Sequence, residues 1–217
     1  MNQWASSCLA PVLLATAAPQ SGHIAISSYT SVPFASDGVN LFYPVFSLDD
    51  SAVETAINDR IAANIRHLLA DWTRRPAGSK ADGGVLRVAV DEEQNVLSLL
   101  MNVTFDIPGA VHPHSLMYAE NYSLDDGSPI RPIDFLDIDR LIGRIQAQAI
   151  FCPAGCAARS FAEQTDYLAS LPDHALESHL LEGSIMWLPG DSILIVLPVP
   201  HALGGFALLL ADKFALS

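Results

Sequence analysis

Basic residues are scarce in this 217-residue chain, which has 11 Lys and Arg against 24 Asp and Glu and a formal net charge of −13. Non-specific binding to nucleic acid needs a basic surface that neutralises phosphates, so the charge balance argues against nucleic-acid partners. An acidic surface favours a cationic partner through electrostatic steering, although acidity also simply keeps a protein soluble. The charge therefore excludes one class of function and leaves these two interpretations open.

Cysteines and long apolar runs are also few. Three cysteines do not make a disulfide framework. Cys152 and Cys156, in C-P-A-G-C, are spaced too widely for a thioredoxin-type C-x-x-C and too sparsely for a zinc site. They either pair across a tight loop in an oxidising compartment or are small core residues beside a helix end. No run reaches the ~18 apolar residues that a membrane helix needs, so we expect no membrane span.

Residues 1–22 form an N-terminal segment that we expect to be flexible or signal-like. Cys8 to Ala18 is apolar, and Ala15-Thr16-Ala17 resembles a small-residue cleavage site. The positively charged start of a signal peptide is missing, since no Lys or Arg occurs before Arg60. The segment is therefore a poor or truncated signal peptide, the product of a misassigned start, or a disordered tail.

Sequence motifs for catalysis are missing as well, including G-x-S-x-G, H-E-x-x-H and the phosphate loop. His112 and His114 are the strongest candidates for chemistry, because an H-x-H pair on a strand turns both rings to one side. Asp106 or Glu120 would supply a third metal ligand, but no spacing demands it and Pro113 bends the pair. We therefore expect no catalytic residue, no metal, no cofactor, and a structural histidine at a turn.

The hydrophobic half of the residues is enough to bury a core, and its periodicity predicts an α+β fold. We expect a mixed or mainly antiparallel sheet with one long amphipathic helix and additional shorter helices packed on it. Residues 23–217 form a single domain in this prediction, with a soft internal boundary near residues 129–132. The long helix spans Asp49 to Trp72, and Ser51 and Glu54 have the spacing of a capping box. Its apolar stripe comprises Val53, Ile57, Ile61, Ile65, Leu68 and Trp72.

The remaining elements follow from alternating or apolar runs between turn signals. Strands are predicted over His23–Ser31, Val39–Phe46, Gly84–Val90, Val96–Phe105, His114–Leu124, Ser184–Leu188, Ser192–Val199 and Phe206–Leu210. A second helix is predicted over Asp137–Phe151, and two shorter helices or turns are predicted over Ser160–Leu171 and Asp173–Glu182. Pro44 cannot donate to a sheet ladder, so its strand lies at an edge or carries a bulge. The strand from His114 carries large side chains on both faces, which places it inside a sheet.

The most distinctive motif is Gly109-Ala110-Val111-His112, followed by Asn121-Tyr122-Ser123-Leu124-Asp125-Asp126-Gly127. Asp125 and Asp126 are turn formers in this interpretation rather than catalytic carboxylates, because Asp-Asp-Gly after an alternating run indicates a tight turn. With the long helix before it and a P-I-x-F-L segment after it, this order resembles the extracytoplasmic domain family of RsiV-like anti-sigma factors and the N-terminal part of PdaC-like deacetylases. The resemblance covers roughly residues 23–210.

The connection from Leu197 to Gly205 is the best candidate for a contact loop. Its prolines and glycines give it a defined shape, so it loses little entropy on binding. The similar family tends to carry P-Y-A-x-G here, and this sequence keeps Pro200, Ala202 and Gly204 but has His201 in place of the aromatic. The alternative is an ordinary strand connection. The predicted partner-binding residues are Pro200, His201, Ala202, Gly204 and His112.

The resemblance implies a non-catalytic binding or sensing domain of the bacterial cell envelope, periplasmic or secreted. In the RsiV branch it implies recognition of lysozyme, and a net charge of −13 suits a cationic partner of that kind. Peptidoglycan is the other partner that the family context suggests. The alternative function is a metal-dependent hydrolase acting on cell-wall material through His112, His114 and a carboxylate. A structural or carrier domain without a ligand is the third possibility.

Overall fold

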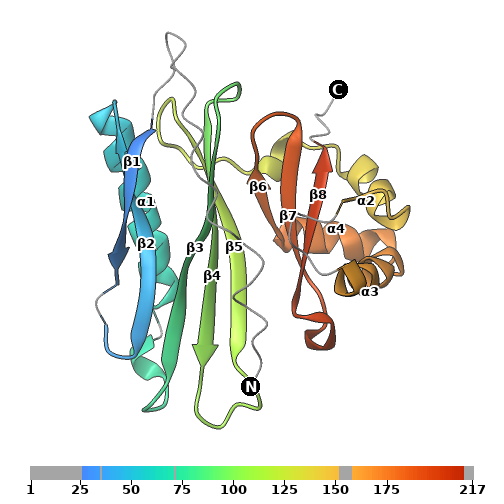
Figure 1. The fold of residues 1–217 in the computed structure, drawn as a ribbon, viewed down its shortest axis with the longest axis horizontal. Coiled ribbons are helices and arrows are strands. Elements are labelled where there is room, and N and C mark those ends of the chain that lie inside the picture. The colour runs from blue at the N-terminus through green and yellow to red at the C-terminus, as the bar shows by residue number, and fades with distance from the viewer. Residues whose placement is uncertain (1–25, 35, 71, 152–157, 213–217) are drawn as a thin grey trace.

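The computed structural model describes residues 26–34, 36–70, 72–151 and 158–212. Within them the chain forms two β-sheets that lie face to face, with one long helix outside the first sheet and shorter helices outside the second (Figure 1). The predicted α+β fold is confirmed. The N-terminal segment 1–22 and the pair Cys152 and Cys156 lie outside the described residues. No helix in the described part of the chain is long and apolar enough to cross a membrane.

The first sheet has the strand order β1-β2-β3-β4-β5. Its strands are β1 (Ile26–Pro33), β2 (Val39–Leu48), β3 (Lys80–Asp91), β4 (Val96–Asp106) and β5 (His114–Ser123). Neighbouring strands are antiparallel except β2 and β3, which pair in parallel over a short stretch, Val39–Leu41 with Ala81–Gly83. Pro44 is therefore not on an edge strand, but it lies beyond this short pairing with β3, where a missing N–H costs no bond to that strand.

Strand β5 corrects one prediction, because it is the outermost strand of its sheet and not an inner one. Its side chains do alternate between two covered faces. Glu120 and Tyr122 lie on the side of the long helix, and Met117 and Ala119 pack against the second sheet. Large side chains on both faces thus report the layers above and below a strand, and they say nothing about hydrogen-bonded neighbours.

The long helix α1 (Ser51–Leu68) crosses from β2 to β3 and covers the outer face of the first sheet. Its stripe is confirmed by the burial of Val53, Ile57, Ile61 and Ile65. The helix ends four residues earlier than expected, and Trp72 belongs to a short 3₁₀ turn, η1 (Trp72–Arg74), where its indole N–H donates to the Asp37 carbonyl at 2.9 Å.

The start of α1 differs from the predicted capping box. Asp50 is the N-cap, and one of its carboxylate oxygens accepts hydrogen bonds from the N–H groups of Ala52 and Val53. The Glu54 carboxylate accepts from the N–H of Leu48, at 2.8 Å, which ties the helix to the end of β2. The Asp50 carboxylate suits this position because it satisfies two free helical donors at once and also complements the positive end of the helix.

The second sheet is antiparallel in the order β6-β7-β8, and a short turn, η3 (His201–Leu203), joins β7 to β8. Its strands are β6 (Ser184–Trp187), β7 (Ser192–Pro198) and β8 (Phe206–Asp212). The helices outside it are η2 (Pro132–Phe135), α2 (Ile138–Gln146), α3 (Ala158–Ala169) and α4 (Asp173–Glu182). Helix α2 is shorter than predicted, because Gln148 has a positive φ of 51° and Phe151 pairs with Leu210 of β8.

The two sheets meet through an apolar layer, one buried amide and the buried Asp91 carboxylate, which accepts from the indole N–H of Trp187 at 2.9 Å. Ala89 and Leu100 of the first sheet pack against Met186, Leu194 and other side chains of the second. The Asn121 side chain donates to the carbonyl of Ile185 at 2.8 Å and accepts from the N–H of Trp187 at 3.0 Å, so it takes the place of a backbone neighbour at the edge of β6.

Candidate functional site

The structure brings two of the predicted site residues into contact, although they are far apart in the sequence. His112, in the loop between β4 and β5, lays its imidazole against that of His201 in η3, with 3.9 Å between ring centroids and an interplanar angle of 16°. Both side chains are exposed. One loop from each sheet therefore contributes to a single surface. We call His112, Pro200, His201, Ala202 and Gly204 the paired-loop surface.

The second of these loops is held in shape by its own backbone and by α3. The N–H of Leu203 donates to the Pro200 carbonyl at 2.7 Å, and the N–H of Gly204 donates to the His201 carbonyl at 2.9 Å. Gly204 has a φ of 104°, a conformation that strongly favours glycine. The Gln164 amide of α3 donates to the carbonyls of Leu203 and Phe206, at 2.7 and 3.0 Å. His201 is thus presented from a braced turn.

The residues weighed for a metal site do not gather around His112. His114 stacks on Phe105, with 6.5 Å between ring centroids, while Nδ1 of His112 lies 3.3 Å from the Pro113 carbonyl. Glu120 lies farther along β5 and faces α1, where it bonds to other residues. Among the described residues, no group of three or more His, Cys, Asp or Glu side chains is arranged to hold a metal ion.

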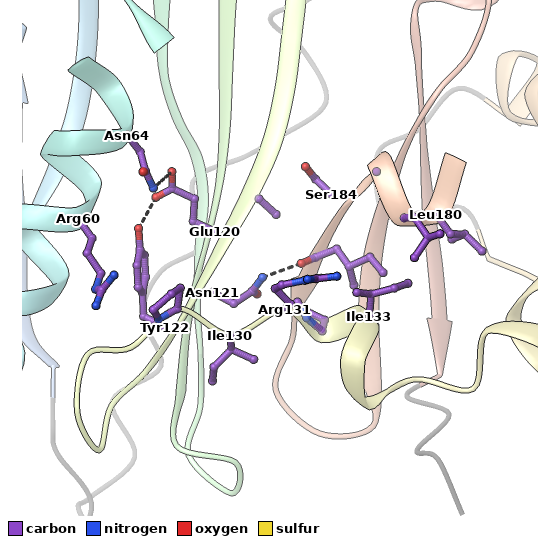
Figure 2. Close-up of a pocket in the computed structure, with 16 residues that line it drawn as sticks. Arg60, Asn64, Glu120, Asn121, Tyr122, Ile130, Arg131, Ile133, Leu180 and Ser184 are labelled. Carbon is purple, nitrogen blue, oxygen red and sulfur yellow. Dashed lines mark hydrogen bonds between the residues drawn. The ribbon is translucent and has the colours of Figure 1, made fainter. Parts of the chain in front are cut away.

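A second candidate site is a cleft of about 380 Å³ at the outer edge of β5 (Figure 2). Helix α1 and β5 form one wall, and β6 with the end of α4 forms the other. The segment 129–133, which follows β5 and includes the first two residues of η2, closes the space between the two walls. Its lining residues are Arg60, Asn64, Ala119, Glu120, Asn121, Tyr122, Pro129, Ile130, Arg131, Pro132, Ile133, Leu180, Leu181, Gly183, Ser184 and Ile185.

The Glu120 carboxylate is the centre of a polar network in the first wall. Its two oxygens accept hydrogen bonds from the Asn64 amide at 2.9 Å and from the Tyr122 hydroxyl at 2.6 Å. Burial raises the pKa of the Glu120 carboxyl, and these two hydrogen bonds only partly oppose that effect. Burial, followed by the charge of Glu120, also raises the pKa of the Tyr118 and Tyr122 hydroxyls.

Two arginines line the same cleft, and they differ in whether another side chain pairs with them. Arg131 forms a salt bridge with Asp134 at 3.4 Å, and both side chains are more than half exposed. The Arg60 guanidinium has no hydrogen bond or salt bridge to any residue in the described ranges, although its charge acts on Tyr122 and Asp126. Away from α1 most of the lining is apolar, although Arg131 and Ser184 also lie there, and Leu181 is 56% exposed. The cleft therefore offers a polar end beside α1 and a largely apolar end that includes one arginine.

Sequence reasoning missed this cleft, because it considered Glu120 only as a metal ligand and did not connect it with Arg60. The available signal was the strand alternation that set Tyr118, Glu120 and Tyr122 on one face. The aspartates of the following turn were interpreted correctly as turn formers. The Asp126 carboxylate accepts from the N–H of Ser128 at 2.9 Å, and hydrogen bonds from Ser128 lower its pKa.

Comparison with known proteins gives only distant likeness. No protein-family model matches the sequence, and no curated protein matches it. A DUF3298 family protein from Pseudomonas aeruginosa has 10% sequence identity and a TM-score of 0.45, over 88% of this chain and 89% of its own. A member of the same family from Bacteroides fragilis has 13% identity and a TM-score of 0.45, over 88% and 90%. The structural neighbours of this chain are thus DUF3298 family proteins, at a similarity too low to carry an argument about its function.

Proposed function

We propose that this chain is a non-catalytic binding or sensing domain of the bacterial cell envelope that contacts a cationic protein such as lysozyme through the paired-loop surface. The observation that carries the proposal is the stack of His112 on His201. It joins one exposed ring from each sheet into one contact surface, and both rings stand on the loops that the sequence singled out.

The composition of this surface suits protein recognition. Val111, next to His112, is 98% exposed and adds an apolar contact to the two rings. Aromatic and apolar groups on a preformed loop bind with little loss of conformational freedom. The net charge of −13 accelerates the encounter with a basic partner. Peptidoglycan fragments are the second ligand to examine, because the family resemblance implies a cell-wall context.

Calorimetric titration with hen lysozyme at low salt tests the proposal. We expect His201→Ala to weaken binding about tenfold, because it removes a central aromatic contact, and His201→Tyr to preserve it. His174→Ala is the matched control, since it removes an exposed histidine from α4 outside the paired-loop surface. The proposal is wrong if lysozyme and peptidoglycan fragments both fail to bind, or if His201→Ala binds as well as the parent protein.

The location outside the cytoplasm needs its own experiment. A fusion of residues 1–22 to an alkaline phosphatase lacking its leader reports export, because that enzyme gains activity only after its disulfides form outside the cytoplasm. We expect an active fusion. Phosphatase that stays inactive in the cytoplasm would contradict an export signal in this segment.

A further inference from the structure

The cleft beside Glu120 lies away from the paired-loop surface, at the other end of β5. His112 precedes the first residue of that strand, and Glu120 and Tyr122 stand near its last residue. A strand rises about 3.3 Å per residue, which puts roughly 20 Å between the two sites. Ligand binding in the cleft would therefore be a second function of the molecule, independent of lysozyme binding by the paired-loop surface.

Arg60 indicates a negatively charged group on the ligand. It is one of only 11 basic residues in the chain, and its guanidinium lines the cleft without a hydrogen bond or salt bridge to any described residue. A guanidinium presents its N–H groups as a planar fork that matches a carboxylate. Arg131 also lines the cleft, beside Ile133, but its guanidinium is already paired with the Asp134 carboxylate.

Glu120 indicates a hydrogen-bond donor on the same ligand. Each of its oxygens already accepts one bond, from Asn64 or from Tyr122, and a carboxylate has about four acceptor positions. The remaining positions suit an ammonium or an amide N–H. Figure 2 shows Arg60, Asn64 and Glu120 together at one end of the cleft, with Ile133 and Leu180 at the other.

The apolar end indicates an aliphatic side chain. Ile130, Ile133 and Leu181 line the space together with Leu180. A volume of about 380 Å³ falls within the range of about 300–1,000 Å³ that is usual for small-ligand pockets. A fatty acid lacks the donor that Glu120 requires, and a sugar acid lacks the apolar group. We propose that the cleft binds a short peptide with a free C-terminal carboxylate and an apolar side chain.

In this arrangement the peptide carboxylate binds Arg60, its ammonium or amide N–H donates to Glu120, and its aliphatic side chain contacts Ile133 and Leu181. The test uses the dipeptide Ala-Leu, its C-terminal amide, Ala-Ala, octanoate and glucuronate. Binding is followed by chemical-shift changes of the ¹⁵N-labelled full chain. We expect Ala-Leu to bind about tenfold more tightly than its amide, because hydrogen bonds to charged groups are the strong ones.

Arg60→Gln should remove the preference for the acid over the amide. Arg66→Gln is the matched control, because Arg66 is an exposed arginine of the same helix that does not line the cleft. Leu181→Ser should weaken Ala-Leu but not Ala-Ala. Since Arg60, Arg66 and Leu181 are all exposed, we expect these variants to fold, as circular dichroism will check.

Three results would overturn the proposal. The first is no binding of either dipeptide, the second is equal binding of acid and amide by the parent protein, and the third is tighter binding of octanoate or glucuronate than of Ala-Leu. None of these affects lysozyme binding by the paired-loop surface. Conversely, Arg60→Gln should leave the affinity for lysozyme unchanged, so the two proposals fail separately.

Discussion

Replacing Asn121 with alanine should weaken the join between the two sheets more than any comparable loss of a surface amide. The Asn121 side chain is 5% exposed and connects three buried groups. It accepts from the Ser98 hydroxyl at 2.7 Å and from the Trp187 N–H at 3.0 Å, and it donates to the Ile185 carbonyl at 2.8 Å. Alanine removes all three bonds and puts no polar atom in their place.

The size of the effect follows from those three groups. A buried donor or acceptor that loses its partner costs about 1–3 kcal/mol. The Ser98 hydroxyl can rotate toward another acceptor, so its share falls at the lower end of this range. We therefore expect Asn121→Ala to lower the free energy of unfolding by about 3–5 kcal/mol, a large part of the ~5–15 kcal/mol that holds a domain together. Ser98→Ala, which removes one of the bonds, should cost about 1 kcal/mol.

Urea denaturation followed by tryptophan fluorescence and circular dichroism measures these differences. Asn40→Ala is the control, because the Asn40 amide also donates to a side chain, that of Asp82 at 3.0 Å, but at the exposed end of β2. Its effect should stay within about 0.5 kcal/mol. If Asn121→Ala is within about 1 kcal/mol of Asn40→Ala, the buried amide does not hold the two sheets together.

Three further changes test the helix, the turn and the cleft. Ile61→Asp should prevent folding because Ile61 is fully buried, whereas Ala63→Asp on the exposed face should give soluble protein by gel filtration. Gly127→Ala should lower the melting temperature more than Gly109→Ala does. Both glycines have a positive φ, but a Cβ on Gly127 would lie 2.7 Å from a side chain of α1, whereas a Cβ on Gly109 would have no atom within 4 Å. Glu120→Gln should alter the pH dependence of stability. Burial raises the pKa of this carboxyl above 4.5, so the parent should lose stability relative to the variant as pH rises above the ordinary titration range of a carboxyl, and parallel urea-denaturation profiles would refute this.

Long periodic segments made most of the fold predictable from the sequence. The stripe from Val53 to Ile65 recurs at helical spacing over several turns, so α1 was found with its buried face. Its cap was harder to assign, because Asp49, Asp50 and Ser51 all have capping chemistry and only the path of the chain selects Asp50. The edge position of β5 was out of reach, because side-chain patterns record which faces are covered and not which strand lies alongside.

The candidate sites depend on contacts that no local pattern encodes. His201 was chosen for the loop that carries it and His112 for the motif in which it lies, but their stacking results from the packing of one sheet on the other. The cleft draws its lining from α1, β5, the segment 129–133, the end of α4 and the start of β6. Its polar groups come from α1, β5, Arg131 and Ser184, and each is unremarkable alone. Its chemistry exists only after these segments come together.

Strand β5 explains why the cleft forms where it does. Successive residues at its end point to opposite layers: Glu120 and Tyr122 toward α1, and Asn121 toward β6. Because β5 is the last strand of its sheet, no strand in the described ranges lies beyond it, and the segment 129–133 covers that space only in part. The residue that joins the sheets is thus flanked by the residues that supply the polar wall. A ligand held there contacts both layers, so its binding must stabilise the arrangement that Asn121 maintains.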